Sequence, residues 1–271
     1  MKKYLYLVCL TFILSAVSCK QKSNQEKIET AKTVEPVEKW TPIFNGKDLN
    51  DWIVKIKGHP AGVNYKNTFI TEDGCIKVNY DEYNDTFNAS FGHIYYNKPF
   101  SNYKLRLQYR FTGKQLSDGP SWAIANSGVM IHCEDPKKIG VDQNFPVSVE
   151  VQLLGGLSSE ERPTGNLCTP GTHVVLDNKI ATDHCFESSS KTYHGDQWVK
   201  LEIEVRNDSI IKHFINGEEV IQYCKPQYGG EVDFNKEHWK SFEGKPLKAG
   251  YISLQSESHP VEFKDIEILE L

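Results

Sequence analysis

The chain has 271 residues, of which 39% are hydrophobic and 25% charged, so it is long and apolar enough to bury a globular core. Its formal net charge is −5, and no run of Lys and Arg of the kind that neutralises phosphates occurs in it. We therefore expect no nucleic-acid partner.

The N-terminus reads as a targeting signal and not as part of the fold. Two lysines precede an apolar run from Tyr4 to Val17, which is too short to span a membrane as a helix. Small residues stand directly before Cys19, which resembles a bacterial lipoprotein signal and implies a lipid on Cys19 after removal of residues 1–18. The alternative is an ordinary secretory signal in which Cys19 is incidental.

Residues 19–39 have the composition of a flexible tether. They are polar, rich in Lys, Gln and Glu, and contain one Pro and no aromatic residue. We expect the folded domain to occupy residues 40–271. An exported lipoprotein of this kind would face the periplasm or the cell surface and would touch the membrane only through its lipid anchor.

The expected domain is a succession of short β-strands. Residues 41–49 read as a short strand and a turn, and Asp-Gly and Asn-Gly pairs mark two hairpins. The remaining strands and hairpins are expected at residues 52–56, 68–78, 92–96, 103–111, 126–133, 147–153, 198–205, 210–223, 250–257 and 261–268. No long helical period occurs, and two long connections, 155–196 and 224–248, read mainly as loops. The pattern predicts an all-β jelly-roll sandwich of two antiparallel sheets.

Cysteines allow one disulfide to be predicted. Five remain in the expected domain, an odd number, so at least one thiol has no partner within the chain. Cys168 and Cys185 flank a loop rich in Gly, Pro and Asp, and we expect a bridge between them. The alternative is that all five are small buried apolar residues. The chain has no C-x-x-C pair, which argues against a zinc site built on cysteines.

The strand at 147–153 carries the leading candidates for chemistry. It alternates, so that Glu150 and Gln152 point away from the core, about 7 Å apart. Other strands also have polar residues on the side opposite the core, and neighbouring strands would join them into one groove. These residues are Arg106, Gln108, His132, Gln255 and Glu257. Each of them taken alone is better explained as a solvated side chain, and the groove depends on the whole set lying together.

Candidate roles follow from residue type. Two carboxylates such as Glu150 and Glu257 around a sugar fit glycoside hydrolysis. His132 and His259 titrate near neutral pH and can transfer protons, although a lone histidine such as His132 is often structural. Aromatic rings such as Trp122 stack on sugar faces.

Several segments together resemble one family, the 3-keto-disaccharide hydrolases, also described as a 3-keto-glucoside 1,2-lyase/hydratase domain. The resemblance spans residues 40–271 and rests on the order of these segments: 44–49 (FNGKDL) with Trp52, 103–107 (YKLRL), 126–129 (NSGV), 149–152 (VEVQ), 198–199 (WV), 214–217 (FING) and 250–263 (GYISLQSESHPVEF).

This resemblance implies a concanavalin A-like jelly roll that acts on 3-keto-glycosides in carbohydrate degradation. The expected reaction removes the C2 proton, expels the C1 substituent by elimination, and includes or is followed by hydration of the glucal product. A divalent metal ion that polarises the ketone fits such chemistry, with ligands unassigned. Alternatives are a non-catalytic carbohydrate-binding module and a conventional two-carboxylate glycoside hydrolase.

Matching positions point to Glu150 with Gln152 and to the segment from Gln255 to His259. The resulting catalytic candidates are Glu150, Glu257, His132 and His259. The substrate-binding candidates are Gln152, Gln255, Arg106 and Trp122.

Overall fold

The computed structural model describes residues 38–271, which form one compact unit. The signal peptide, the lipid on Cys19 and nearly all of the expected tether lie outside the described residues. No helix within residues 38–271 is long and apolar enough to cross a membrane.

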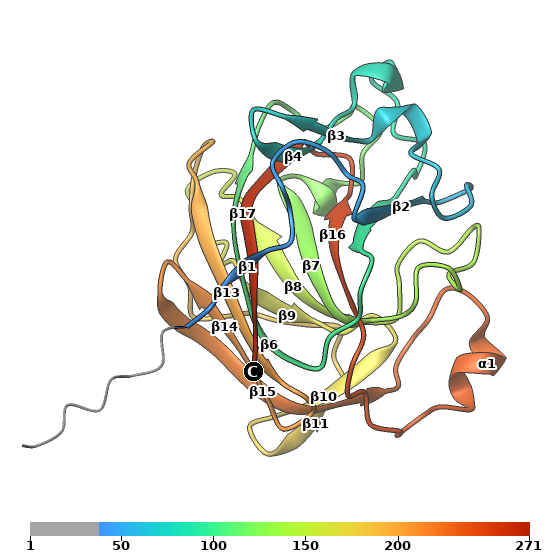
Figure 1. Ribbon diagram of the computed structural model, residues 1–271, viewed down its shortest axis with the longest axis vertical. Coiled ribbons are helices and arrows are strands. Elements are labelled where there is room, and N and C mark those ends of the chain that lie inside the picture. Colours follow the sequence, from blue (N-terminus) through green and yellow to red (C-terminus); the bar gives the residue numbers. More distant parts are fainter. Residues whose placement is uncertain (1–37) are drawn as a thin grey trace, which may run out of the picture. The chain divides into compact units, whose positions relative to one another are not determined.

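The larger of two antiparallel sheets has ten strands (Figure 1). In spatial order they are β11 (Lys179–Ala181), β10 (Thr172–Leu176), β15 (Glu218–Tyr228), β14 (Ile210–Ile215), β13 (Val199–Arg206), β6 (Asn102–Phe111), β17 (Val261–Glu270), β4 (Cys75–Val78) and β3 (Phe69–Glu72), with β1 (Thr41–Pro42) paired to β17.

The smaller sheet has seven strands and positions the candidate site. Its order is β12 (Cys185–Phe186), β9 (Asn166–Cys168), β8 (Val149–Leu154), β7 (Asn126–Cys133), β16 (Tyr251–Ser256), β5 (Gly92–Tyr96) and β2 (Trp52–Ile56). Helical turns are short: η1 (Tyr65–Asn67), η2 (Asp81–Tyr83), η3 (Ser121–Ala123) and α1 (Lys236–Lys240). The predicted all-β jelly-roll sandwich of two antiparallel sheets is confirmed.

The core lies between the two sheets because each strand turns its apolar alternate residues inward. On β8 the inward residues Val149, Val151 and Leu153 have no exposed surface. On β6 every second residue from Tyr103 to Phe111 is buried, while the residues between them are half-buried. Burying one such aliphatic or aromatic side chain stabilises the fold by about 1.5–3 kcal/mol, which fixes the register of each strand.

The connection from 155 to 196 differs from the expectation of a mainly irregular loop. It contains β9 to β12, which extend the edges of both sheets. These strands have two to five residues, too few for an alternating pattern to stand out in the sequence. The expected disulfide is present between Cys168 and Cys185, which are also cross-strand partners. Cys75, Cys133 and Cys224 are free thiols.

Candidate functional site

A continuous row of residues, polar except for one glycine, crosses the outer face of the seven-stranded sheet. Gln255 belongs to it because its neighbour Leu254 pairs with Val129, which places Gln255 across from Gly128. Read through successive cross-strand pairs from β9 to β2, the row is Asn166, Gln152, Gly128, Gln255, His93 and Lys55. The strands of Glu150 and Gln255 therefore share one face, as expected, with only β7 between them.

Glu150 leans from β8 across β7. Its cross-strand partner is Met130, yet its carboxylate lies over Gly128. A Cβ atom built on Gly128 would stand 2.6 Å from Oε1 and 2.9 Å from Cγ of Glu150. The absent side chain of Gly128 thus provides the space that the carboxylate occupies.

We expect Gly128→Ala to push the Glu150 carboxylate out of place without unfolding the protein. The φ of Gly128 lies outside the left-handed region, so alanine adopts this backbone without strain. Displacement of the Glu150 carboxylate from its position over Gly128 is expected to lower kcat/KM by about 10²-fold. Turnover assays run beside thermal unfolding test this, and unchanged turnover in a folded variant would show that the position of Glu150 does not matter.

Glu150 and Glu257 form a buried acidic pair. They are 7% and 3% exposed, respectively. Burial raises the pKa of Glu150, and burial together with the charge of Glu150 raises the pKa of Glu257 well above its usual range. No neighbouring cation contributes to either shift. Near neutral pH both carboxyl groups therefore hold their protons, and as the pH rises Glu150 ionises first while Glu257 stays protonated.

Several buried polar atoms around this pair have no hydrogen-bond partner in the described part of the chain. They are Asn126 Oδ1, His93 Nε2, Ser253 Oγ, Tyr95 OH, Gln255 Oε1 and Glu257 Oε2. Leaving a buried polar atom unpaired costs about 1–3 kcal/mol, so folded proteins rarely accumulate them. Because these unpaired polar atoms lie on one face of the seven-stranded sheet, that face is suited to binding a polar ligand.

The connection between β7 and β8 covers part of this face. Ile139 from this segment packs against the cluster that contains Tyr95 and Met130. Phe145 from the same segment lies with its ring centroid 6.4 Å from that of His93. This cover explains why the polar row is buried even though it faces away from the core.

Trp122 marks the exposed rim of the covered face. It is 52% exposed and lies on η3, directly before β7. Its ring stacks on Phe91 at a centroid distance of 5.9 Å and an interplanar angle of 9°. Its backbone carbonyl accepts a hydrogen bond from Asn126. The structure therefore joins Trp122 to the site, in a position suited to stacking on a sugar ring.

His132 does not lie on the outer face. Its φ is +48°, and the pairing of β7 with β16 is irregular between Tyr251 and Ser253, so the alternation breaks at this point. The imidazole Nε2 lies 2.9 Å from the carbonyl oxygen of Asn207, between β13 and β14 of the opposite sheet. Strict alternation predicts that His132 shares the outer face with Glu150. The irregular pairing instead turns the imidazole toward Asn207 of the opposite sheet.

His259 also lies apart from the polar row. Its ring packs edge-on against Phe111 of β6, with centroids 5.7 Å apart, at the end of the inter-sheet core. Burial and the charge of Arg162 lower the pKa of His259 to about 4. It is therefore neutral at physiological pH.

The structure does not bring Arg106 to the face of Glu150, contrary to the sequence-based expectation, because β6 belongs to the ten-stranded sheet. Arg106 donates from Nε to Glu267 at 2.7 Å, and its guanidinium lies 4.0 Å from the ring centroid of Trp40. Gln108 on the same strand donates to Asp265 at 2.6 Å.

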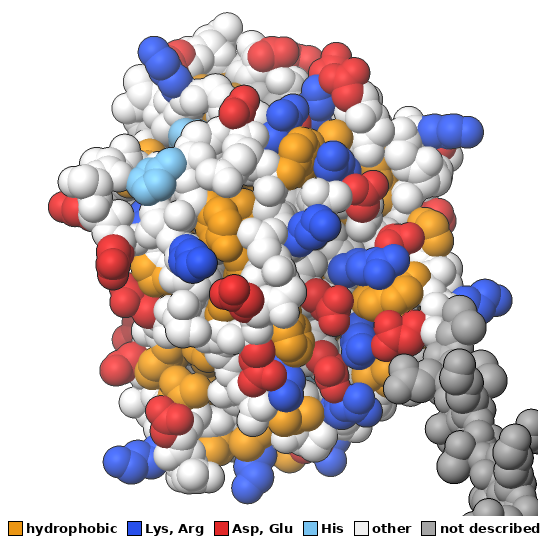
Figure 2. Space-filling view, turned by 90° about the vertical axis from the view of Figure 1, so that its left-hand side faces the viewer, with side chains coloured by type: hydrophobic (Ala, Val, Ile, Leu, Met, Phe, Trp, Pro, Cys, Tyr) orange, Lys and Arg blue, Asp and Glu red, His pale blue; other side chains and the backbone are white. Residues whose placement is uncertain are grey.

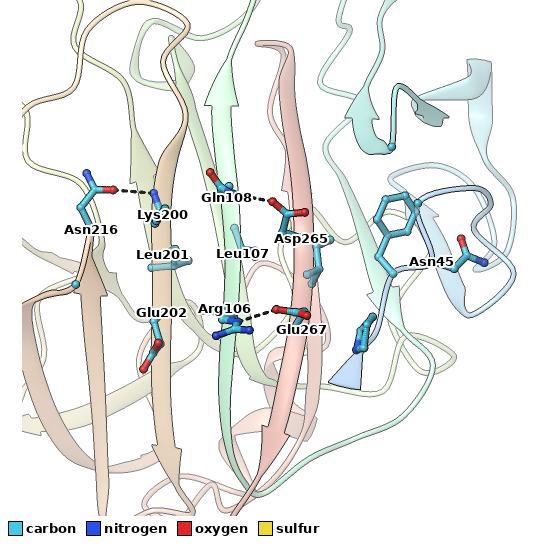
Figure 3. A pocket seen from close by; sticks show the side chains of 16 residues that line it. Asn45, Arg106, Leu107, Gln108, Lys200, Leu201, Glu202, Asn216, Asp265 and Glu267 are labelled. Atoms are coloured by element: carbon cyan, nitrogen blue, oxygen red, sulfur yellow. Dashed lines mark hydrogen bonds and ion pairs between the residues drawn. The ribbon is translucent and has the colours of Figure 1, made fainter. Parts of the chain in front are cut away.

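These side chains line a groove of about 920 Å³ on the outer face of the ten-stranded sheet (Figure 3). In it, Arg106 and Gln108 point toward acidic partners on β17 and its irregular segment. Figure 2, which faces this side of the molecule, shows Lys and Arg interspersed with Asp and Glu. Paired and partly exposed charges of this kind are typical of a solvated sheet face.

No metal-binding cluster is found in residues 38–271, where no three His, Cys, Asp or Glu side chains are grouped so that they could hold an ion. A divalent metal ion, whose ligands the sequence leaves unassigned, stays a prediction.

Sequence reasoning missed four polar members of the site: His93, Lys55, Asn126 and Asn166. Lys55 interrupts an otherwise apolar strand, WIVKI, and is 3% exposed. A lone charged residue within such a strand is the one signal that pointed to it. His93 and Asn126 stand at the start of their strands and carry no pattern of their own.

The described residues form a sandwich of antiparallel sheets with buried carboxylates and amides on one covered face and an aromatic rim. The chain belongs to the family of 3-keto-alpha-glucoside-1,2-lyase-like domains, which it matches over residues 39–269. This membership indicates an enzyme that acts on glycosides. No curated protein matches the chain.

Solved structures similar to this chain include the three that follow, and the first of them, with a TM-score above 0.5, has a similar fold. A candidate glycosyl hydrolase of Parabacteroides distasonis ATCC 8503 is 19% identical, with a TM-score of 0.51 over 86% of this chain and 100% of that chain. A second one from this organism is 22% identical over 86% and 94% of the two chains, with a TM-score of 0.48. A carbohydrate-binding module of Bacillus subtilis is 8% identical over 83% and 98%, with a TM-score of 0.44.

Proposed function

We propose that this protein cleaves 3-keto-glycosides by removing the C2 proton and eliminating the C1 substituent. The observation that carries the proposal is the buried pair of Glu150 and Glu257, in which Glu150 ionises at a lower pH than Glu257 and no cation contributes to either pKa. Such a pair provides a base and an acid at the same pH, which an elimination across the C1–C2 bond requires.

The ketone at C3 makes the C2 proton acidic. Glu150 takes this proton, and the electron pair of the C2–H bond forms an enolate that spans C2, C3 and the ketone oxygen. The enolate then collapses to a C1–C2 double bond as the bond from C1 to the aglycone oxygen breaks. Glu257 gives its proton to that oxygen, so the products are a 3-keto-glucal and a free alcohol, and hydration of the glucal follows by addition of water.

The two acidic roles are assigned from their surroundings. Glu257 is the more buried of the two and has an unpaired, inaccessible Oε2. The charge of Glu150 further disfavours its ionisation. Glu257 therefore keeps its proton to a higher pH than Glu150, which makes Glu257 the acid, while Glu150 over Gly128 is the base once it is ionised. The amides of Gln152, Gln255 and Asn126 are suited to hold the sugar hydroxyls.

Incubation with a 3-keto-glucoside and, separately, with its unoxidised parent tests the proposal. We expect the 3-keto substrate to yield free alcohol and a glucal or its hydrate by product NMR, with and without a chelator, and the parent to remain intact. Cleavage of the parent would favour a conventional glycosidase. Binding of either sugar without product would favour a carbohydrate-binding module.

Export as a lipoprotein remains part of the proposal. The Cys168–Cys185 bridge supports an oxidising compartment such as the periplasm or the cell surface. A lipid on Cys19 stays a prediction, which fatty-acid labelling of the full chain and of Cys19→Ser would test.

A further inference from the structure

His93 stands on the outer face of β5 between two polar neighbours. It is 3% exposed, and its cross-strand partners are Gln255 on β16 and Lys55 on β2. The ring of Phe145 meets it edge-on. Its Nε2 atom is buried and has no hydrogen-bond partner among residues 38–271.

A structural histidine of this protein looks different. His213 is fully buried, and its two ring nitrogens lie 2.8 Å from the carbonyl oxygen of Gly165 and 2.8 Å from the hydroxyl of Tyr223. Both ring nitrogens of His213 thus have hydrogen-bond partners within the protein, whereas Nε2 of His93 has none among residues 38–271. His132 and His259 also each have a buried ring nitrogen without a partner among residues 38–271, but of these three histidines only His93 lies in the polar row, which points to a ligand as the partner of its Nε2.

Lys55 lies behind His93 and is held in place by the backbone. Its ammonium group donates to the carbonyl oxygens of Ile56 at 2.9 Å and Val141 at 3.0 Å. The second bond ties β2 to the segment that covers the sheet. Burial and the positive charge of Lys55 lower the pKa of His93 to about 3, so His93 is a neutral imidazole at physiological pH.

We propose that His93, supported by Lys55, binds the C3 oxygen of the substrate and stabilises the negative charge that forms there. This inference rests on the proposed function. In the row across the sheet, Gln255 separates His93 from Gly128, over which Glu150 lies. A sugar lying over Gln255 thus has the base at one end and His93 at the other.

The roles balance chemically. As Glu150 removes the C2 proton, the electron pair moves into the C2–C3 bond and the carbonyl electrons move onto O3. A neutral imidazole N–H donates to this oxygen without giving up its proton, and the charge of Lys55 favours the enolate electrostatically. When the C1 substituent leaves, the electrons return from O3 and the ketone is restored, so neither residue is consumed.

The enolate step is isolated by a probe that lacks a leaving group at C1, 1,5-anhydro-3-keto-glucitol. In D₂O the wild-type protein is expected to exchange the C2 proton of this sugar for deuterium, which NMR follows directly. His93→Phe is expected to slow that exchange by about 10²–10³-fold, the usual loss for one oxyanion donor. His93→Gln retains an N–H donor and is expected to recover most of the rate.

Lys55→Met gives a second readout. We expect slower exchange and, because the neighbouring charge is gone, a higher pKa of the His93 imidazole by NMR titration. His238→Phe, an exposed histidine on α1, is the matched control and is expected to exchange at the wild-type rate.

The outcomes separate the inference from the proposed function. Exchange at the wild-type rate in folded His93→Phe overturns the role of His93 and leaves the elimination standing. A wild-type protein that neither exchanges the probe nor cleaves a 3-keto-glucoside overturns both. If His93→Phe does not fold, Lys55→Met decides, and an unchanged exchange rate with an unchanged imidazole pKa overturns the inference.

Discussion

Glu150→Gln is expected to lower kcat/KM for a 3-keto-glucoside by about 10²–10⁴-fold, the range of a lost general base. Glutamine has nearly the same shape, so it fills the space over Gly128, but it does not accept the C2 proton. Steady-state turnover with the 3-keto substrate measures the effect. Glu267→Gln, which alters a carboxylate on the opposite sheet, is the matched control and is expected to keep full activity.

The same substitution is expected to make the protein more stable at alkaline pH. Burial raises the pKa of Glu150 in the folded state, so the unfolded chain ionises first, from a pKa of about 4.3. Stability is therefore lost as pH rises from the unfolded pKa to the folded one, and Gln removes this loss. Urea unfolding should show a gain of about 1–3 kcal/mol at pH 9 and little change at pH 4.

Loss of activity combined with a gain in stability is the signature of a functional carboxylate. A purely structural Glu150 would give the reverse pattern, with full turnover or with lower stability in the glutamine variant. Either result would remove the role assigned to Glu150.

Glu257→Gln is expected to impair substrates according to their leaving group. An alkyl or sugar aglycone needs a proton as it departs, so we expect a loss of about 10²–10⁴-fold in kcat/KM. A nitrophenyl aglycone departs as a stable anion and is expected to lose much less. The ratio of kcat/KM for the two substrates, compared with wild type, is the measurement, and equal losses for both would contradict the role of Glu257 as acid.

The pH profile provides the control for this variant. Wild-type kcat/KM is expected to be bell-shaped: activity falls at low pH as Glu150 gains a proton and at high pH as Glu257 loses one. Both limbs lie above the usual carboxyl range, because burial raises both pKa values and the charge of Glu150 further raises that of Glu257. Glu257→Gln should lose the alkaline limb and keep the acidic limb in place, since Glu257 is neutral when Glu150 ionises.

The polar row on the seven-stranded sheet is buried because the connection between β7 and β8, which covers it, is held in place by hydrogen bonds. Val141 accepts a hydrogen bond from Lys55, and Glu134 accepts one from the backbone N–H of Val147, so the segment is tied at its middle and at its base. With Phe145 directed at His93, this cover keeps water from the sheet face. A low-polarity surrounding raises the carboxyl pKa values and strengthens each charged contact with a substrate.

The sequence by itself determined the strands and their inward faces. Segments such as 103–111 and 149–154 alternate because successive side chains of a strand point to opposite faces of the sheet. Only the face that packs in the core has to be apolar. Together with the resemblance to the 3-keto-disaccharide hydrolases, this alternation pointed to Glu150, Gln152, Gln255 and Glu257, and the strands of Glu150 and Gln255 belong to one sheet.

Only the tertiary structure decided which polar residues belong together. Arg106 alternates as regularly as Glu150, but strand order assigns it to the other sheet, and alternation contains no information on order. His132 does not lie on the outer face of the seven-stranded sheet because the pairing of its strand is irregular. His93 and Lys55 do lie on this face, because strands that are distant in the chain pair there. Such long-range pairing is set by the packing of the whole core, which no local pattern of residues records.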